Sequence, residues 1–155
     1  MGKSLTVIRD IEPVWDNIKV ILSEVKEKIK NLNPRLTQST VLACTELLEN
    51  SIKYGEHKNS PSVHFVLEIA DSNMKILVSN KLSNEDSIRV VKGFIDLIRI
   101  SNIEQLYIQR LREIINNPRS GYSQMGLYRI VHEAKFNLDY SITNDILTIT
   151  ASRQI

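Results

Sequence analysis

Two polar residues interrupt an apolar segment, and their types and spacing could support chemistry. Glu46 and Asn50 lie four positions apart, and a helix turns about 100° per residue, so both side chains would project from nearly the same face. A carboxylate can accept a proton or orient a hydroxyl group, and an amide oxygen can ligate a hard cation such as Mg²⁺. The pair therefore indicates either a catalytic and metal-binding site or, as the simpler alternative, an ordinary solvated helix face.

The residues around this pair predict the helix that holds it. Apolar residues recur at helical spacing on the opposite face, and they are Val41, Cys44, Leu48 and Ile52. The single cysteine cannot form an internal disulfide, and its place on this stripe predicts a small buried hydrophobic side chain. Lys53 lies beside the polar pair. We therefore expect Glu46 and Asn50 to face a cavity rather than bulk solvent.

A second candidate site is the glycine-containing segment Ser120–Leu127, which leads into a predicted helix. Free N–H groups at the start of a helix, together with the helix dipole, favour the binding of a phosphate group. Gly121 and Gly126 would let the backbone approach such a ligand closely. The alternative is a plain loop in which Ser123 acts as an ordinary N-cap.

Composition indicates one ordinary globular domain over residues 1–155. Hydrophobic residues make up 42% and charged residues 25% of a chain that is long enough to bury a core. The net charge of +2 is small, and the basic residues are interleaved with acidic ones, which argues against nucleic-acid binding. No apolar run approaches the ~18 residues of a membrane span, and no signal peptide opens the chain. We therefore expect a cytoplasmic protein that does not bind membranes.

Hydrophobic periodicity predicts the order of helices and strands. Pro34 is expected in the first turn of the second helix, and Asp71–Asn73 and Asn144-Asp145 are expected to form hairpin turns. The expected elements are an edge strand at 5–8, helices at about 15–29 and 34–55, strands at 62–69 and 74–79, helices at 87–100 and from 101, a helix at 123–136, and strands at 138–143 and 146–151.

This order predicts an α+β fold, a two-layer sandwich with helices on one face of a mixed, mainly antiparallel sheet. Three packing details follow from the pattern. Trp15 is expected in the core as part of the apolar face of its helix. Ser101 is expected to begin a helix through a capping box with Glu104, and Leu111 is expected on the apolar side of that helix.

The segment from Glu46 to Gly55 resembles the Asn-bearing box of the GHKL ATPases, which include gyrase, sensor histidine kinases and bacterial anti-sigma-factor kinases. The segment Ser120–Leu127 is similar to their later glycine box, which caps the ATP triphosphate. The resemblance covers about residues 11–152, and it is closest to SiaB-type protein kinases and the anti-sigma-factor kinases. The closer likeness is carried by Val78-Ser-Asn80, Leu106-Tyr107, Gly121 to Leu127 and Leu138-Asp-Tyr140.

The resemblance implies a role for each matching position. Asn50 would ligate the Mg²⁺ that bridges the phosphates of ATP, and Glu46 would act as the base or orient the acceptor hydroxyl. The glycine box would hold nucleotide phosphates, mainly through backbone N–H groups, at Ser120, Gly121, Gly126 and Leu127. Lys53 and Arg119 are added to the nucleotide site on charge and position, because either could reach the triphosphate.

One position departs from the family pattern. The family has an Asp-x-Gly-x-Gly box after the second hairpin strand, and its Asp binds the adenine amino group. Here the sequence reads Ser79-Asn-Lys-Leu-Ser-Asn84, in which Asn80 could offer only a neutral carbonyl to that group. Because this Asp and the glycines are missing, both an ATP-binding and a non-catalytic function stay open.

The resemblance therefore implies one of two functions. The first is an ATP- and Mg²⁺-dependent regulatory protein serine/threonine kinase in a partner-switching pathway. The second is a pseudo-kinase, a non-catalytic interaction module of the same fold. In both cases the expected partner is a small anti-sigma-antagonist-like or SiaC-like protein, and the chain itself could form a homodimer.

Overall fold

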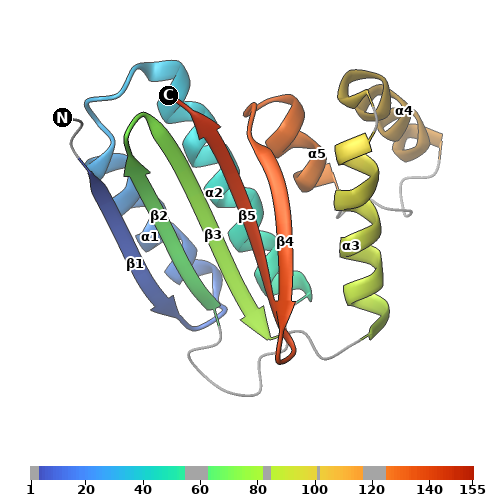
Figure 1. Ribbon diagram of the computed structural model, residues 1–155, viewed down its shortest axis with the longest axis horizontal. Coiled ribbons are helices and arrows are strands. Elements are labelled where there is room, and N and C mark those ends of the chain that lie inside the picture. The colour runs from blue at the N-terminus through green and yellow to red at the C-terminus, as the bar shows by residue number, and fades with distance from the viewer. Residues whose placement is uncertain (1–3, 55–62, 82–84, 101, 117–124) are drawn as a thin grey trace.

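The computed structural model describes residues 4–54, 63–81, 85–100, 102–116 and 125–155. Within these ranges the chain forms strands and helices in an order that matches the expected one (Figure 1). The elements are β1 (Leu5–Ile11), α1 (Trp15–Lys28), α2 (Pro34–Tyr54), β2 (Val63–Ala70), β3 (Asn73–Lys81), α3 (Glu85–Ile100), α4 (Ile103–Asn116), α5 (Met125–His132), β4 (Asn137–Thr143) and β5 (Ile146–Gln154).

The strands form one sheet in the order β1-β2-β3-β5-β4, and all of its pairings are antiparallel. Two tight hairpins set the register. Asp71 and Ser72 have φ of 52° and 66°, and Asn144 and Asp145 have φ of 53° and 63°. Positive φ at both central residues is the geometry of type I′ turns, whose twist matches that of the flanking strands. Both predicted hairpins are therefore confirmed.

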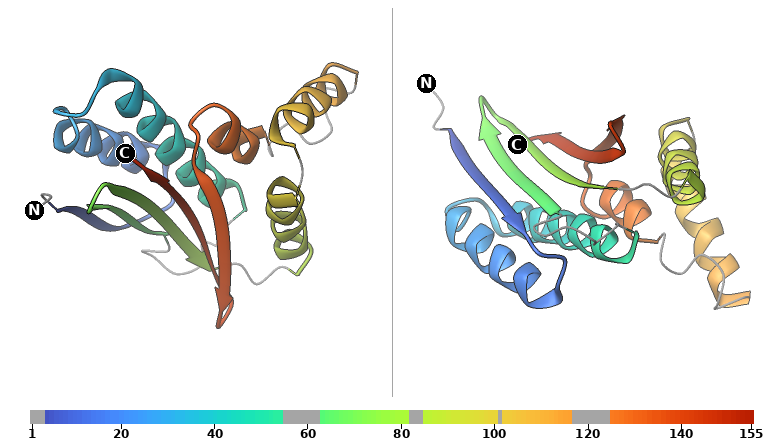
Figure 2. Two further views of the ribbon diagram at one scale, coloured as in Figure 1. Left: turned by 45° about the horizontal axis from the view of Figure 1, so that its top comes forward. Right: turned by 90° about the horizontal axis from the view of Figure 1, so that it is seen from below.

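The helices cover one face of this sheet, and the core lies between the two layers. Figures 1 and 2 show α1, α2 and α5 behind the strands, with α3 beside β4 and α4 farther out. Alternate strand residues such as Phe65, Leu67 and Ile76 point into this interface and are fully buried. The predicted α+β sandwich is confirmed. Among the described helices, none has both the length and the apolar character to cross a membrane.

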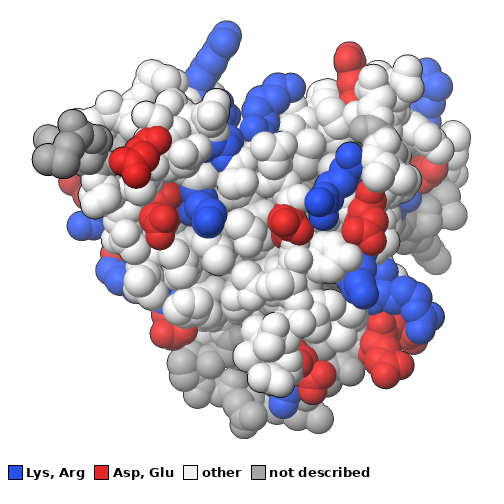
Figure 3. All heavy atoms as spheres, in the orientation of Figure 1, with Lys and Arg blue, Asp and Glu red and all other residues white. Residues whose placement is uncertain are grey.

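The opposite face of the sheet is not covered by any described helix, and uncharged side chains occupy much of it (Figure 3). A row of paired residues crosses this face from Ile8 through Val66 and Leu77 to Thr150. Ile8 is 51% exposed. The functional argument below concerns the helical side, where the buried polar residues lie.

Helix α2 has a well-defined beginning and a buried side. The N–H of Leu36 donates to Asn33 Oδ1 at 2.8 Å, so Asn33 is the N-cap and Pro34 occupies the first helical position, as expected. Cys44 on the apolar side is fully buried, as predicted, and burial raises the pKa of its thiol to about 12. The thiol therefore stays protonated and acts as a packing group.

Four predicted boundaries or contacts are wrong, and the first is the end of β5, which lies at Gln154 rather than at Ala151. Strand β1 continues to Ile11. Trp15 is 48% exposed rather than in the core, because periodicity defines the apolar face of α1 but not how much of its length is covered. Helix α5 ends at His132 because Lys135 adopts a left-handed conformation with φ of 63°, which a continuing helix does not allow.

The start and packing of α4 also differ from expectation. The N–H of Gln105 donates to Asn102 Oδ1 at 3.1 Å, so Asn102 caps this helix, while Ser101 lies outside the described residues. Leu111 is 38% exposed. The partly buried side of α4 instead includes Leu106 and Tyr107, because this helix packs on α5 rather than on the sheet.

Candidate functional site

Five buried polar residues among those that the structure describes mark the candidate site. They are Thr40, Glu46, Asn50, Ser51 and Asn80. The hydroxyl groups of Thr40 and Ser51 donate to carbonyls of their own helix at 2.7 and 2.6 Å, so both are satisfied locally. The other three have no such local helix partner. These three are the residues that the sequence assigned to catalysis, to metal binding and to the adenine amino group.

Glu46 and Asn50 lie on the side of α2 that is turned toward the interior, and each is only 8% exposed. This excludes the simple alternative of a solvated helix face. Asn80 is also 8% exposed and lies near the end of β3. Figures 1 and 2 show this end of β3 beside the C-terminal end of α2, so the fold brings Asn80 to the same end of the molecule as Asn50.

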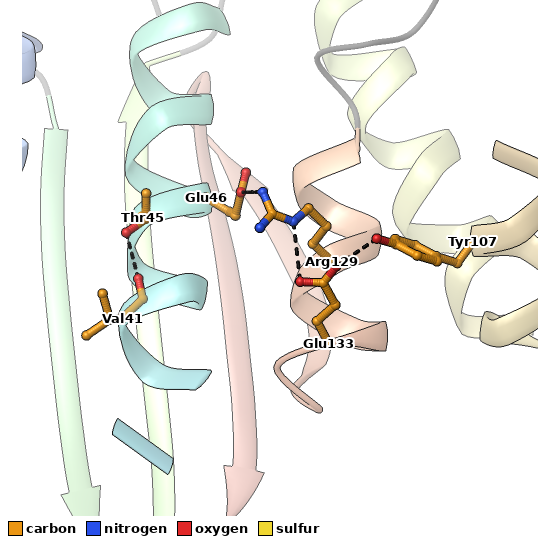
Figure 4. Close-up of polar contacts among 6 residues, drawn as sticks. All are labelled: Val41, Thr45, Glu46, Tyr107, Arg129 and Glu133. Atoms are coloured by element: carbon orange, nitrogen blue, oxygen red, sulfur yellow. Dashed lines mark hydrogen bonds and ion pairs between the residues drawn. The ribbon is translucent and has the colours of Figure 1, made fainter. Parts of the chain in front are cut away.

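Two residues of α5, Arg129 and Gly126, lie against the carboxylate of Glu46. Arg129 Nη1 donates to Glu46 Oε1 at 2.7 Å (Figure 4). A Cβ atom added at Gly126 would overlap Glu46 Oε2 and lie 3.2 Å from its Cδ, so a side chain at position 126 would force this carboxylate to move. Gly126 and Arg129 are three residues apart and therefore lie on one side of the helix.

A chain of polar contacts continues from Arg129 to helix α4. Arg129 Nε lies 3.5 Å from Glu133 Oε2, and the hydroxyl of Tyr107 donates to Glu133 Oε1 at 2.7 Å. Figure 4 shows the four side chains in line across α2, α5 and α4. The ring of Tyr107 also stacks on that of His132, with 4.3 Å between centroids. These polar contacts thus connect Glu46 of α2 with α5 and α4.

Burial raises the pKa of Glu46, because a carboxylate loses its hydration on leaving water. The positive charge of Arg129 opposes this effect but does not overcome it. The remaining charged groups that act on Glu46 contribute less, and they are Glu49 and Lys53 on α2 and Glu133 just after α5. A raised pKa is common among carboxyl groups that act as general acids or bases.

Glu46 also borders a groove on the outer side of the helical layer. The groove holds about 550 Å³ and is lined by residues of α1, α2 and α5, including Lys26, Val41, Leu42, Thr45, Glu46 and Arg129. The hydroxyl of Thr45 donates to the carbonyl of Val41 at 2.7 Å and is therefore engaged within the helix (Figure 4). Glu46 and Glu49 are the acidic residues that line this groove, and Glu46 is the one of the two that is buried.

The residues present fit a Mg²⁺ ion that is held mostly by nucleotide phosphates. The carboxamide of Asn50 is buried and makes no hydrogen bond to any residue that the structure describes. No cluster of three or more His, Cys, Asp or Glu side chains suited to a metal occurs among the described residues. Mg²⁺ commonly takes only one or two protein ligands and completes its shell with phosphates and water. One amide oxygen is consistent with that arrangement.

The other predicted nucleotide-binding residues divide into three groups. Arg119, Ser120 and Gly121 lie outside the described residues. Lys53 is exposed near the end of α2. Leu127 is 3% exposed and packs in the hydrophobic core. The nucleotide-binding roles given to these residues and to Gly126 stay predictions.

Sequence reasoning missed Arg129, Glu133 and Tyr107. A signal was present, because Gly126, Arg129 and Glu133 follow one another at spacings of three and four, which would place them on one side of a helix, although the structure ends α5 at His132, one residue before Glu133. This polar stripe on α5 mirrors the stripe of Glu46 and Asn50 on α2. Sequence alone does not show that the two stripes face each other.

No protein-family model and no curated protein matches the chain. Among solved structures, the SiaB–SiaC complex from Pseudomonas aeruginosa matches with a TM-score of 0.66 and 15% identity, over 97% of this chain and 89% of that chain. The RsbU and RsbW domains of Rv1364c from Mycobacterium tuberculosis match with a TM-score of 0.57 and 9% identity, over 97% of this chain and 32% of that chain. This chain therefore spans about a third of the latter. At these identities the likeness shows the fold alone, and it agrees with the predicted α+β sandwich.

The close approach of Gly126 to Glu46 predicts that alanine at position 126 destabilises the folded protein. Gly126→Ala should lower the free energy of unfolding by about 1–3 kcal/mol, because the added methyl group overpacks against a buried carboxylate. Gly93 in α3 is the matched control, since a Cβ there meets nothing within 4 Å. Gly93→Ala should stabilise by about 0.4–1 kcal/mol. Urea denaturation of both variants tests this, and equal effects would contradict the proposed fit.

The raised pKa of Glu46 predicts a pH-dependent stability. The unfolded chain releases the Glu46 proton at the ordinary glutamate pKa of about 4.3, whereas the folded protein keeps this proton to a higher pH. The contribution of Glu46 to stability should therefore fall as pH rises from about 4.3 through its folded pKa. The wild type should lose stability relative to Glu46→Gln over this window in urea titrations. Glu68→Gln, on the exposed β2 surface, controls for removal of one charge.

Proposed function

We propose that this chain is a regulatory protein serine/threonine kinase that binds Mg·ATP at Asn50 of α2 and acts on a small partner protein. The observation that carries the proposal is the joint burial of Glu46 and Asn50, one turn apart on α2. A buried amide with no hydrogen-bond partner among the described residues is costly to keep unless it serves a purpose, and a buried carboxylate stays costly even beside Arg129. The fold shared with the SiaB structure and the RsbW-domain structure supports the same reading.

Each residue has a defined task in this proposal. Bound ATP would supply the phosphoryl group that passes to a serine or threonine hydroxyl of the partner, leaving ADP. Asn50 would hold Mg²⁺ through its amide oxygen, and Asn80 would accept a hydrogen bond from the adenine amino group. Glu46 would orient the acceptor hydroxyl or take its proton, for which a raised pKa is suitable. The groove beside Glu46 gives an acceptor segment access to this carboxylate.

A non-catalytic interaction module is the second candidate. Two observations favour it. Asn80 occupies the place where the GHKL resemblance implies an Asp, so the adenine site lacks its charged partner. In addition, Arg129 already pairs with one oxygen of Glu46, which makes the carboxylate a weaker base. The protein would then regulate its partner by binding alone, and the partner would again be a small anti-sigma-antagonist-like or SiaC-like protein.

Nucleotide titration by calorimetry separates the two candidates. The kinase proposal predicts that the wild type binds ATP in a Mg²⁺-dependent manner. Asn50→Ala should weaken this binding by about 1–3 kcal/mol, the usual value for an interaction with a charged group. Asn137→Ala, which removes an exposed amide on β4, should not. The absence of any heat with the wild type at millimolar Mg·ATP would exclude the kinase and leave the interaction module.

A second variant separates catalysis from binding. Glu46→Gln keeps the size of the side chain and removes its charge. Phosphoryl transfer to a partner isolated by pull-down from the source cell should fall by roughly 10²–10⁴, the usual contribution of general-base assistance. Nucleotide affinity should stay within a few-fold, and Glu68→Gln serves as the control. If Glu46→Gln phosphorylates the partner at the wild-type rate, Glu46 has a structural role only.

A further inference from the structure

Arg129 is the residue through which Glu46 contacts the rest of the helical layer. Its guanidinium meets two carboxylates, with Nη1 2.7 Å from Glu46 Oε1 and Nε 3.5 Å from Glu133 Oε2. The side chain of Arg129 is 41% exposed, whereas that of Glu46 is 11% exposed. The buried carboxylate therefore depends on a cation that is partly in solvent and is shared with a second carboxylate.

Glu133 in turn has partners on two helices. One of its oxygens is the acceptor for the Tyr107 hydroxyl of α4 at 2.7 Å, and the other faces Arg129. The ring of Tyr107 stacks on His132 with an interplanar angle of 11°. This arrangement couples the two contacts, because a change in the position of Tyr107 alters how strongly Glu133 attracts Arg129.

We infer that Arg129 is a positioning residue, which holds the Glu46 carboxylate against Gly126, and that Glu133 and Tyr107 make this hold depend on the position of helix α4. When Tyr107 contacts Glu133, that carboxylate is partly satisfied and Arg129 is available to Glu46. When α4 moves away, Glu133 loses its donor and competes more strongly for Arg129. The carboxylate of Glu46 is then released toward the groove. The consequence for phosphoryl transfer rests on the proposed function, whereas the coupling itself does not.

The first test needs neither nucleotide nor partner. The side-chain carboxyl of Glu46 is followed by ¹³C NMR over a pH series in the wild type and three variants. Arg129→Ala should move the midpoint of this resonance upward, because the opposing positive charge is lost. Tyr107→Phe keeps the stacked ring and removes only the hydroxyl, so it should move the midpoint in the same direction and by less.

Tyr140→Phe is the matched control for this experiment. Its hydroxyl also donates to a carboxylate, that of Asp96 at 3.2 Å, but it joins β4 to α3 and has no part in the chain of contacts to Glu46. The Glu46 resonance should be unchanged in Tyr140→Phe. If Tyr107→Phe leaves the resonance as unchanged as Tyr140→Phe does, the coupling to α4 is wrong.

The second test concerns turnover. With a phosphorylatable partner, Arg129→Ala should change kcat while the KM for ATP stays within a few-fold, and Arg129→Lys should restore part of the change. An unaltered kcat in Arg129→Ala would overturn the positioning role. If the wild type binds no nucleotide, the proposed function fails, and the NMR comparison alone then decides whether Arg129, Glu133 and Tyr107 are coupled to Glu46.

Discussion

The burial of one carboxylate constrains the helical layer of this protein. Moving a charged carboxylate out of water costs several kcal/mol, and the cost is recovered only with a well-placed partner. Glu46 meets this requirement through a 2.7 Å contact with Arg129, whose own side chain remains 41% exposed. The pair therefore lies between a surface ion pair, worth about 0–1 kcal/mol, and a buried one, whose disruption costs about 3–5 kcal/mol. The raised pKa of Glu46 shows that the desolvation is only partly offset.

Several other features follow from this requirement. Helix α5 approaches α2 closely at the level of Glu46, and Gly126 allows this with the carboxylate in its present position, because a Cβ there would force the carboxylate to move. Arg129 must lie on the same side of α5, which its spacing of three residues provides. The sheet behind these helices fixes their separation, since α2 and α5 both pack on its buried face (Figures 1 and 2). The arrangement places a carboxyl group with adjustable protonation beside the free amide of Asn50.

Local sequence patterns were sufficient for most of the fold. The type I′ turns at Asp71–Ser72 and Asn144–Asp145 and the alternation of Val63, Phe65 and Leu67 depend on neighbouring residues alone, and the structure has them as expected. The errors occur where distant contacts decide the outcome. Trp15 continues the apolar periodicity of α1 yet is exposed, because the extent of sheet coverage is a tertiary property. Leu111 is exposed for a related reason, since α4 packs on α5 and not on the sheet.

The same distinction between local sequence patterns and distant contacts applies to the candidate site. Sequence by itself placed Glu46 and Asn50 on one side of a helix and Gly126 at the start of another, because helical spacing is a local property. It did not indicate that the two helices meet at these residues. Only the packing of α2 and α5 on the sheet, and of α4 on α5, brings Glu46 to Arg129 and extends the contacts to Tyr107, which lies far from Glu46 in the chain. Chain distance carries no information about such contacts, and the geometry of the layers decides them.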